Sequence, residues 1–160
     1  MVGFMGTGKT AVGKELAKRK NWQFVDLDEL IECRQGRSIT DIFAKEGEPY
    51  FRKLEKEALK EIAEEDNFVA ACGGGIVINP DNIKLMKKTG KMICLAAKPD
   101  VILERTRKFK HRPLLQVDNP AGKIEELLKI RAPYYAQADK TIDTSKLSVK
   151  EVAEKIDEQA

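Results

Sequence analysis

The chain has 160 residues, which suits one compact domain with a buried core and leaves little room for a second domain. Its 29 basic and 26 acidic residues give a net charge of +3, too even a balance to favour nucleic acid or a membrane surface as a partner. No apolar run approaches the roughly 20 residues that span a bilayer, and the cysteines show no metal-type spacing. We therefore expect a cytoplasmic protein with reduced thiols.

Strand and helix signals alternate from one end of the chain to the other. Apolar stretches typical of strands occupy residues 1–4, 22–28, 67–72, 91–97 and 140–144. Helix signals fill the intervals and predict helices at residues 9–20, 28–35, 39–47, 48–66, 79–90, 99–109, 121–138 and 148–159. Within residues 48–66, the apolar spacing predicts an inward-facing set of Phe51, Leu54, Leu59 and Ile62.

Buried strands that are separated by helices predict a parallel sheet with helices on both faces. Such sheets bind ligands beyond the carboxyl ends of their strands. Three segments rich in glycine or acid each follow a predicted strand: residues 3–13 (GFMGTGKTAVG), the pair Asp26 and Asp28, and the glycines at 73–75. We therefore expect these three segments to gather at one edge of the sheet.

Residues 3–10, GFMGTGKT, satisfy the pattern G-x4-G-K-[ST] between an apolar start and a helix. Glycines such as Gly6 and Gly8 let backbone N–H groups approach a polyphosphate, and the helix that begins near Lys9 adds its positive end. The Lys9 ammonium can reach the β- and γ-phosphates, and the Thr10 hydroxyl can ligate magnesium. The alternative is a glycine-rich turn that binds nothing, but chance rarely produces the full pattern. The segment predicts that the protein binds nucleotide phosphates.

The remaining motifs narrow the choice among nucleotide enzymes, because the sequence lacks the guanine-reading N-K-x-D of switch GTPases. The motifs, in order, are GxxGxGKT at 3–10, DxD at 26–28, FRxxE at 51–55, GGG at 73–75, RPLL at 112–115 and RxPxY at 131–135. In this set the sequence resembles shikimate kinases across nearly the whole chain. The resemblance implies a three-layer α/β P-loop kinase fold with a five-stranded parallel sheet, helices on both faces and a mobile lid. It also implies phosphorylation of the shikimate 3-hydroxyl by ATP, which gives shikimate 3-phosphate and ADP.

On the substrate side, the resemblance implies roles for several charged residues and for the glycine run. Asp28 matches the aspartate that orients or deprotonates the reacting hydroxyl. Arg52 and Arg131 match the arginines that clamp the substrate carboxylate, and Glu55 is expected to hold Arg52 in place. The backbone is expected to approach the substrate at Gly73, Gly74 and Gly75. A solvated carboxylate, surface salt bridges and a plain turn are the respective alternatives.

On the nucleotide side, Asp26 resembles the acid that helps Thr10 to hold magnesium through water, although a helix N-cap would also explain it. Arg105 is placed like the arginine that packs against adenine. Arg112 lies in the irregular stretch 108–120 and matches the arginine of a lid that closes over the phosphates, where a plain surface loop is the alternative. Ala11 stands where many family members have a second hydroxyl residue. The predicted ATP-binding set is Gly6, Thr7, Gly8, Lys9, Thr10, Ala11, Arg105 and Arg112.

We therefore predict a single domain, residues 1–160, with a lid at about 107–120. It is expected to act as a monomeric shikimate kinase that uses ATP and Mg²⁺ and has neither nucleic acid nor membrane as a partner. Its predicted catalytic residues are Lys9, Asp28 and Arg112. Two alternatives are another small-molecule P-loop kinase, such as a gluconate or nucleoside-monophosphate kinase, and a kinase-like module that binds without catalysis. The DxD, FRxxE and GGG motifs argue against the first, and the intact charged residues argue against the second.

Overall fold

The computed structural model describes residues 1–107 and 117–158. Helices and short strands alternate along it, which confirms the predicted α/β class, with α1 Lys9–Lys20, β1 Gln23–Asp26, α2 Leu27–Gln35, α3 Ile39–Ile62, β2 Phe68–Ala71, the 3₁₀ turn η1 Ile76–Ile78, α4 Pro80–Thr89, β3 Ile93–Ala96, α5 Pro99–Thr106, α6 Pro120–Tyr135, β4 Lys140–Asp143 and α7 Val149–Asp157. Most of the predicted lid, with Arg112, lies outside the described residues. Within those residues, no helix is both long and apolar enough to cross a membrane.

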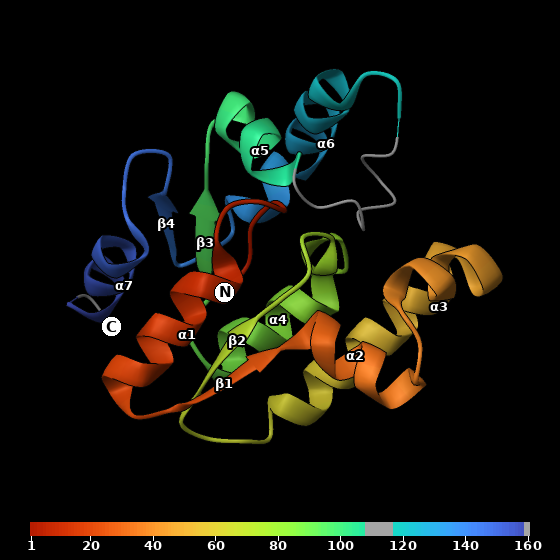
Figure 1. The fold of residues 1–160 in the computed structure, drawn as a ribbon. Coiled ribbons are helices and arrows are strands. Elements are labelled where there is room, and N and C mark those ends of the chain that lie inside the picture. Colours follow the sequence, from red (N-terminus) through yellow and green to blue (C-terminus); the bar gives the residue numbers. More distant parts are fainter. Residues whose placement is uncertain (108–116, 159–160) are drawn as a thin grey trace.

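The strands of the described residues pair in parallel as two separate two-stranded sheets. In the first sheet β1 lies beside β2, with Asp26 opposite Ala71 at their carboxyl ends. In the second sheet β3 lies beside β4, with Ala96 opposite Asp143 (Figure 1). The parallel pairing that the sequence predicted is therefore present in both sheets.

The segment before the glycine-rich loop lies between the two pairs. Val2 forms an isolated parallel bridge with Cys94 of β3, and the backbone N–H of Cys72, just after β2, donates to Met1 O at 2.9 Å. These residues connect the two pairs but form no strand of their own. Gly3 follows them at the start of the loop, with a φ of +136°. The five-stranded sheet is therefore not confirmed, since the described residues contain four strands.

Two apolar clusters cover the strands from opposite faces. On one face, Val12 and Leu16 of α1 pack with Val152 and Ile156 of α7 against β3 and β4, and the two helices lie side by side in Figure 1. The larger cluster is formed by residues of α2 to α6 together with Phe4. Helices therefore cover both faces, and the edge beyond the carboxyl ends of the strands is where the loops converge.

Helix α3 is broken at Gly47, whose φ of +81° and ψ of 174° are not helical. This break agrees with the two helices predicted on either side of residue 47. In the second half of α3, the fully buried residues include Phe51 and Glu55, whereas Leu54 is only half-buried at the edge of the core. The buried face of this half runs from Phe51 through Glu55, four residues on, so it includes a carboxylate that the apolar spacing did not predict.

Candidate active site

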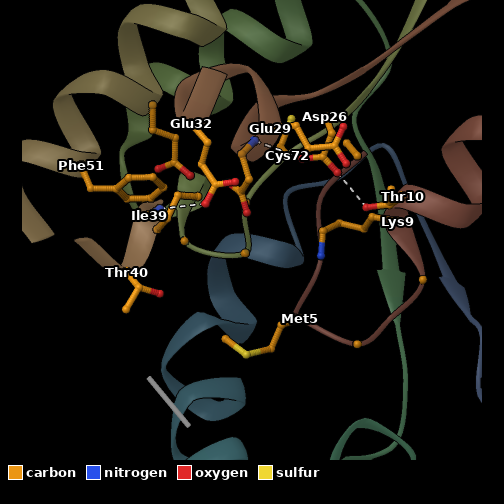
Figure 2. Close-up of a pocket in the computed structure, with 18 of the residues that line it drawn as sticks. Met5, Lys9, Thr10, Asp26, Glu29, Glu32, Ile39, Thr40, Phe51 and Cys72 are labelled. Atoms are coloured by element: carbon orange, nitrogen blue, oxygen red, sulfur yellow. Dashed lines mark hydrogen bonds between the residues drawn. The ribbon is translucent and has the colours of Figure 1, made fainter. Parts of the chain in front are cut away.

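A cavity of about 1110 Å³ lies beyond the carboxyl ends of the strands. Figure 2 shows Lys9, Thr10 and Asp26 toward one end of it and Glu32, Ile39 and Phe51 toward the other. The cavity brings together residues from all the predicted groups, namely Gly6, Gly8, Lys9, Thr10, Ala11, Asp26, Asp28, Arg52, Glu55, Gly73, Gly74, Gly75, Arg105 and Arg131. Thr7 lies behind the cavity wall with its side chain buried, and Arg112 is outside the described residues.

The glycine-rich loop forms one wall of the cavity. Gly6 and Gly8 have φ values of +80° and +94°, which residues with a side chain rarely adopt. Glycine at these positions therefore allows the loop to turn into α1. The ammonium of Lys9 donates to the carbonyls of Gly3 at 3.0 Å and Phe4 at 2.9 Å, which holds it across the loop. With the amino end of α1 beside this cation, the wall is suited to bind an anion.

Thr10 and Asp26 connect the loop to the end of β1. The Thr10 hydroxyl donates to Asp26 Oδ2 at 2.8 Å, while Asp26 Oδ1 accepts from the backbone N–H of Asp28 at 3.0 Å. Asp26 is therefore the N-cap of α2 and a partner of Thr10 at once. Two hard oxygen donors this close fit Mg²⁺, which usually takes one or two protein oxygens together with phosphates and water. In the part of the chain that the structure describes, no cluster of three or more metal-ligating side chains offers a complete protein cage.

A buried ion pair forms the wall opposite the loop. Arg52 Nη1 lies 2.6 Å from Glu55 Oε2, and Arg52 Nη2 lies 2.8 Å from Glu48 Oε1. Glu55 is fully buried, whereas the Arg52 side chain remains partly open to the cavity. A Cβ atom at Gly73 would lie 2.6 Å from Glu55 Oε1, and one at Gly75 would overlap the Arg52 guanidinium. The glycine run therefore makes room for the ion pair.

Arg131 enters the cavity from α6 and is almost entirely buried. Its guanidinium carbon lies 5.6 Å from the centre of the Phe4 ring, and the hydroxyl of Tyr135, one turn further on, donates to Gly74 O at 2.6 Å. Burial raises the pKa of Tyr135 to about 12, so this hydroxyl keeps its proton and its bond to Gly74 at neutral pH. Arg131 and Arg52 therefore bring two guanidinium groups to one cavity, a suitable arrangement for binding a carboxylate.

Arg105 of α5 lies at the end of the cavity that the glycine-rich loop forms. Its Nη1 donates to Gly6 O at 3.2 Å and to the Thr144 hydroxyl at 3.1 Å, and its Nη2 donates to Thr144 O at 2.9 Å. These bonds hold the guanidinium beside the loop, where its exposed side remains available to a ligand.

The cavity also contains residues that the sequence motifs did not indicate. They include Glu29 and Glu32 of α2, and Thr40 and Phe43 of α3. Glu32 lies one helical turn after Asp28, a spacing that could have predicted it on the same face. Its carboxylate accepts from the backbone N–H of Ile39 at 2.8 Å and so joins α2 to α3. Phe43 gave no such signal. It precedes the break at Gly47, and its ring centre lies 5.0 Å from that of Phe51 on the other side of the break.

The buried position of Glu55 leads to a prediction about pH. Burial raises the pKa of Glu55 to about 7; Arg52 opposes this shift and the charge of Asp28 reinforces it. Because the folded-state pKa lies above the ordinary value of about 4.5, the folded state binds the proton more tightly than the unfolded state does. This contribution to stability is complete below pH 4.5 and is lost as the pH rises to about 7. Relative to Glu55→Gln, which cannot titrate, the unfolding free energy should fall by an amount on the order of 3 kcal/mol across that window.

Chemical denaturation of both proteins at pH 4.5, 6 and 8 measures this difference. Glu57→Gln, at an exposed position of the same helix, is the control and should follow the wild type at every pH. A constant difference between the wild type and Glu55→Gln would contradict a raised pKa at Glu55.

Comparison with known proteins confirms the resemblance suggested by the motifs. A family model described as shikimate kinase matches residues 5–160. The chain is 50% identical over 156 residues to the shikimate kinase of Thermoanaerobacter pseudethanolicus, covering 98% of this chain and 91% of that protein. It is 45% identical over 160 residues to the shikimate kinase of Thermus thermophilus, covering 99% and 87%.

Solved structures give the same result. The shikimate kinase from Acinetobacter baumannii, solved in complex with shikimate, matches with a TM-score of 0.94 at 42% identity, covering 97% of this chain and 87% of that one. The shikimate kinase from Aquifex aeolicus matches with a TM-score of 0.85 at 38% identity, covering 97% and 90%. With its motifs, its cavity and these matches in agreement, the chain belongs to the shikimate kinase family.

Proposed function

We propose that the protein is an ATP-dependent kinase that phosphorylates the 3-hydroxyl of shikimate and releases shikimate 3-phosphate and ADP. The family membership supports this assignment. The observation that carries it is the single cavity in which the glycine-rich loop with Lys9 and the group of Asp28, Arg52 and Arg131 face a common space. A phosphoryl donor held at one end can therefore meet an acidic alcohol held at the other.

At the nucleotide end, the loop amides and Lys9 are proposed to bind the β- and γ-phosphates, and Arg105 to contact the adenine. Thr10 and Asp26 are the residues that would hold a divalent ion, for which we propose Mg²⁺. When bound, such an ion neutralises part of the charge on the phosphate oxygens. Arg112 remains a proposed lid residue on the strength of the family resemblance. Residues 6–11 lie at the amino end of α1, whose dipole favours the same anion.

At the substrate end, Arg52 and Arg131 are proposed to clamp the shikimate carboxylate. The Glu55 carboxylate fixes the direction of Arg52 by an ion pair of 2.6 Å, so that the arginine loses little freedom when it binds. Asp28 is proposed to accept a hydrogen bond from the reacting hydroxyl and to orient it, or remove its proton. Gly74 offers a wall without a side chain, whose carbonyl is already held by Tyr135.

Phosphoryl transfer requires little covalent chemistry from the protein, so the proposed rate enhancement comes from positioning and from charge. The cations at the loop stabilise negative charge that spreads over the phosphoryl oxygens. We further propose, on the strength of the family resemblance, that the protein is a cytoplasmic monomer without nucleic acid or membrane partners.

The proposed carboxylate clamp can be tested by kinetics. ADP formation should require both ATP and shikimate, and gluconate or a nucleoside monophosphate should not replace shikimate. Arg131→Lys keeps the charge but loses the planar fork, so KM for shikimate should rise about 10- to 100-fold, as expected for the loss of one hydrogen bond between charged groups. KM for ATP should change less than about threefold.

Lys129→Ala, at an exposed site on the same helix, is the matched control and should leave both KM values unchanged. If KM for ATP and KM for shikimate rise equally in Arg131→Lys, the carboxylate clamp is ruled out. If shikimate does not stimulate ADP formation in the wild type, the proposed function itself is wrong.

The glycine run gives a second, steric prediction. Gly75→Ala places a methyl group against the Arg52 guanidinium and should displace it, which raises KM for shikimate at least about tenfold while the protein stays folded. Gly90→Ala is the control, because a Cβ atom at Gly90 would meet no atom within 4 Å and its backbone is extended. Steady-state kinetics and thermal unfolding of the two variants measure the difference. Wild-type kinetics in Gly75→Ala would mean that Arg52 does not depend on this glycine.

The metal proposal predicts a dependence on Thr10. EDTA should abolish turnover of the wild type and Mg²⁺ should restore it. Thr10→Val removes one of the two proposed oxygen ligands, so the Mg²⁺ concentration for half-maximal activity should rise about tenfold or more. Thr89→Val, on the exposed end of α4, should titrate like the wild type. Activity that persists in EDTA would contradict a metal requirement.

A further inference from the structure

Thr144 is a buried polar residue that the proposed mechanism does not use. It follows β4 directly and lies behind the glycine-rich loop, and it is not among the residues that line the described cavity. Sequence motifs gave it no role. A buried hydroxyl requires hydrogen-bond partners, and the partners of this one lead to the loop.

The Thr144 hydroxyl joins three elements. It donates to the carbonyl of Thr7 in the loop at 3.0 Å and receives a hydrogen bond from Arg105 Nη1 at 3.1 Å. The same Arg105 nitrogen donates to Gly6 O at 3.2 Å. Two consecutive loop carbonyls, those of Gly6 and Thr7, are therefore held from the side of α5 and β4.

Holding a carbonyl also fixes the amide that shares its peptide plane. All peptide bonds of the described residues are trans, so the N–H of Gly8 points opposite to the C=O of Thr7. With Thr7 O directed at Thr144 behind the loop, the Gly8 amide is directed away from Thr144, and Gly8 lines the cavity. The residues on either side of Thr7 are Gly6 and Gly8, both with positive φ values. Because glycine backbones are flexible, these residues do not themselves fix the orientation of the Thr7–Gly8 peptide.

A purely structural role, joining β4 to β3, accounts less well for the hydroxyl. Its oxygen also lies 3.1 Å from Ala96 O, but Ala96 O already accepts from the backbone N–H of Thr144 at 2.8 Å. A hydroxyl has one proton to donate, and Thr7 O gains more from it than a carbonyl that is already bonded. The connection between β3 and β4 is thus made by the backbone, and the hydroxyl is left for the loop.

We propose that Thr144 is a positioning residue for phosphate binding: its hydroxyl, supported by Arg105, sets the loop peptide that presents the Gly8 amide to the β-phosphate of the nucleotide. This inference rests on the proposed function, in that it assumes the loop holds nucleotide phosphates. Fixing the amide before the ligand arrives lowers the ordering cost of binding.

Direct binding of ADP and AMP tests the proposal, because only ADP carries the β-phosphate. In calorimetric titrations without shikimate, Thr144→Val should raise the Kd for ADP about tenfold and the Kd for AMP less than about twofold. Thr144→Ser keeps the hydroxyl and should bind ADP within about threefold of the wild type. Thr106→Val is the matched control, because among the described residues the hydroxyl of this buried threonine bonds to carbonyls of its own helix, those of Ile102 and Leu103.

Three results would overturn the proposal: wild-type ADP affinity in Thr144→Val, an equal loss for AMP and ADP, or an equal loss in Thr106→Val. If Thr144→Val does not fold, Thr144→Ala compared with Thr106→Ala in the same titrations decides the matter. Failure of the proposed function is distinguishable, because the wild type would then bind no ADP or would form no ADP with shikimate. A wild type that does both, beside a Thr144→Val that binds ADP equally well, would refute the positioning role alone.

Discussion

Parallel pairing of the strands is the constraint on which the cavity depends. Because β1 and β2 run in the same direction with Asp26 opposite Ala71, the acids after β1 and the glycines after β2 emerge at the same edge. Residues 1–2 bond to both strand pairs and deliver the glycine-rich loop to that edge as well. Groups from distant parts of the sequence therefore face one space. Asp26 and Asp28 lie within two residues of the end of β1 and the glycines at 73–75 within four of the end of β2, while Arg52 and Arg131 reach the space from helices.

The ion pair between Glu55 and Arg52 offsets the unfavourable free energy of burying a carboxylate beside the cavity. Glu55 is fully enclosed, and burying a carboxylate is unfavourable unless a cation accompanies it. Arg52 supplies the cation, but a pair of this size fits only because Gly73 and Gly75 have no side chains. These two glycines therefore leave space for the side chains of Glu55 and Arg52, in addition to any space that they leave for a ligand. Helix α3 and the turn after β2 therefore contact each other through Arg52 and Glu55, and a change in either one would alter the direction in which Arg52 points into the cavity.

Sequence patterns predicted the helices, four of the five expected strands and most of the residues that meet in the cavity, because glycine runs, capping residues and strand ends carry local signals. What they did not predict depends on long-range packing. The apolar spacing of α3 suggested Leu54 as an inward residue and gave no reason to bury Glu55 fully, since an isolated helix does not reveal which charge has a buried partner. Phe43 lines the cavity with its ring centre 5.0 Å from that of Phe51, across the break at Gly47, and the contact of Thr144 with the loop joins positions 137 residues apart. The division of the strands into two pairs, connected through the backbone of residues 1 and 2, is likewise a feature of long-range pairing.

The cavity proposed to bind a polyphosphate also contains several carboxylates, which would repel that anion. Hydrogen bonds from the protein to these carboxylates explain how they can lie in the same cavity as the phosphates. Asp26 accepts from Thr10 and from the Asp28 amide, and Glu32 accepts from the Ile39 amide. Glu55 is paired with Arg52. The negative charge of these groups is therefore partly balanced by donors of the protein itself, while Lys9, Arg105 and the amino end of α1 act on the loop side. In the proposed function, Lys9 and Arg105 would meet the anion of the donor and Arg52 and Arg131 the carboxylate of the acceptor. Asp26, already bonded to Thr10, and Asp28 would then be left to bind a metal ion and a hydroxyl.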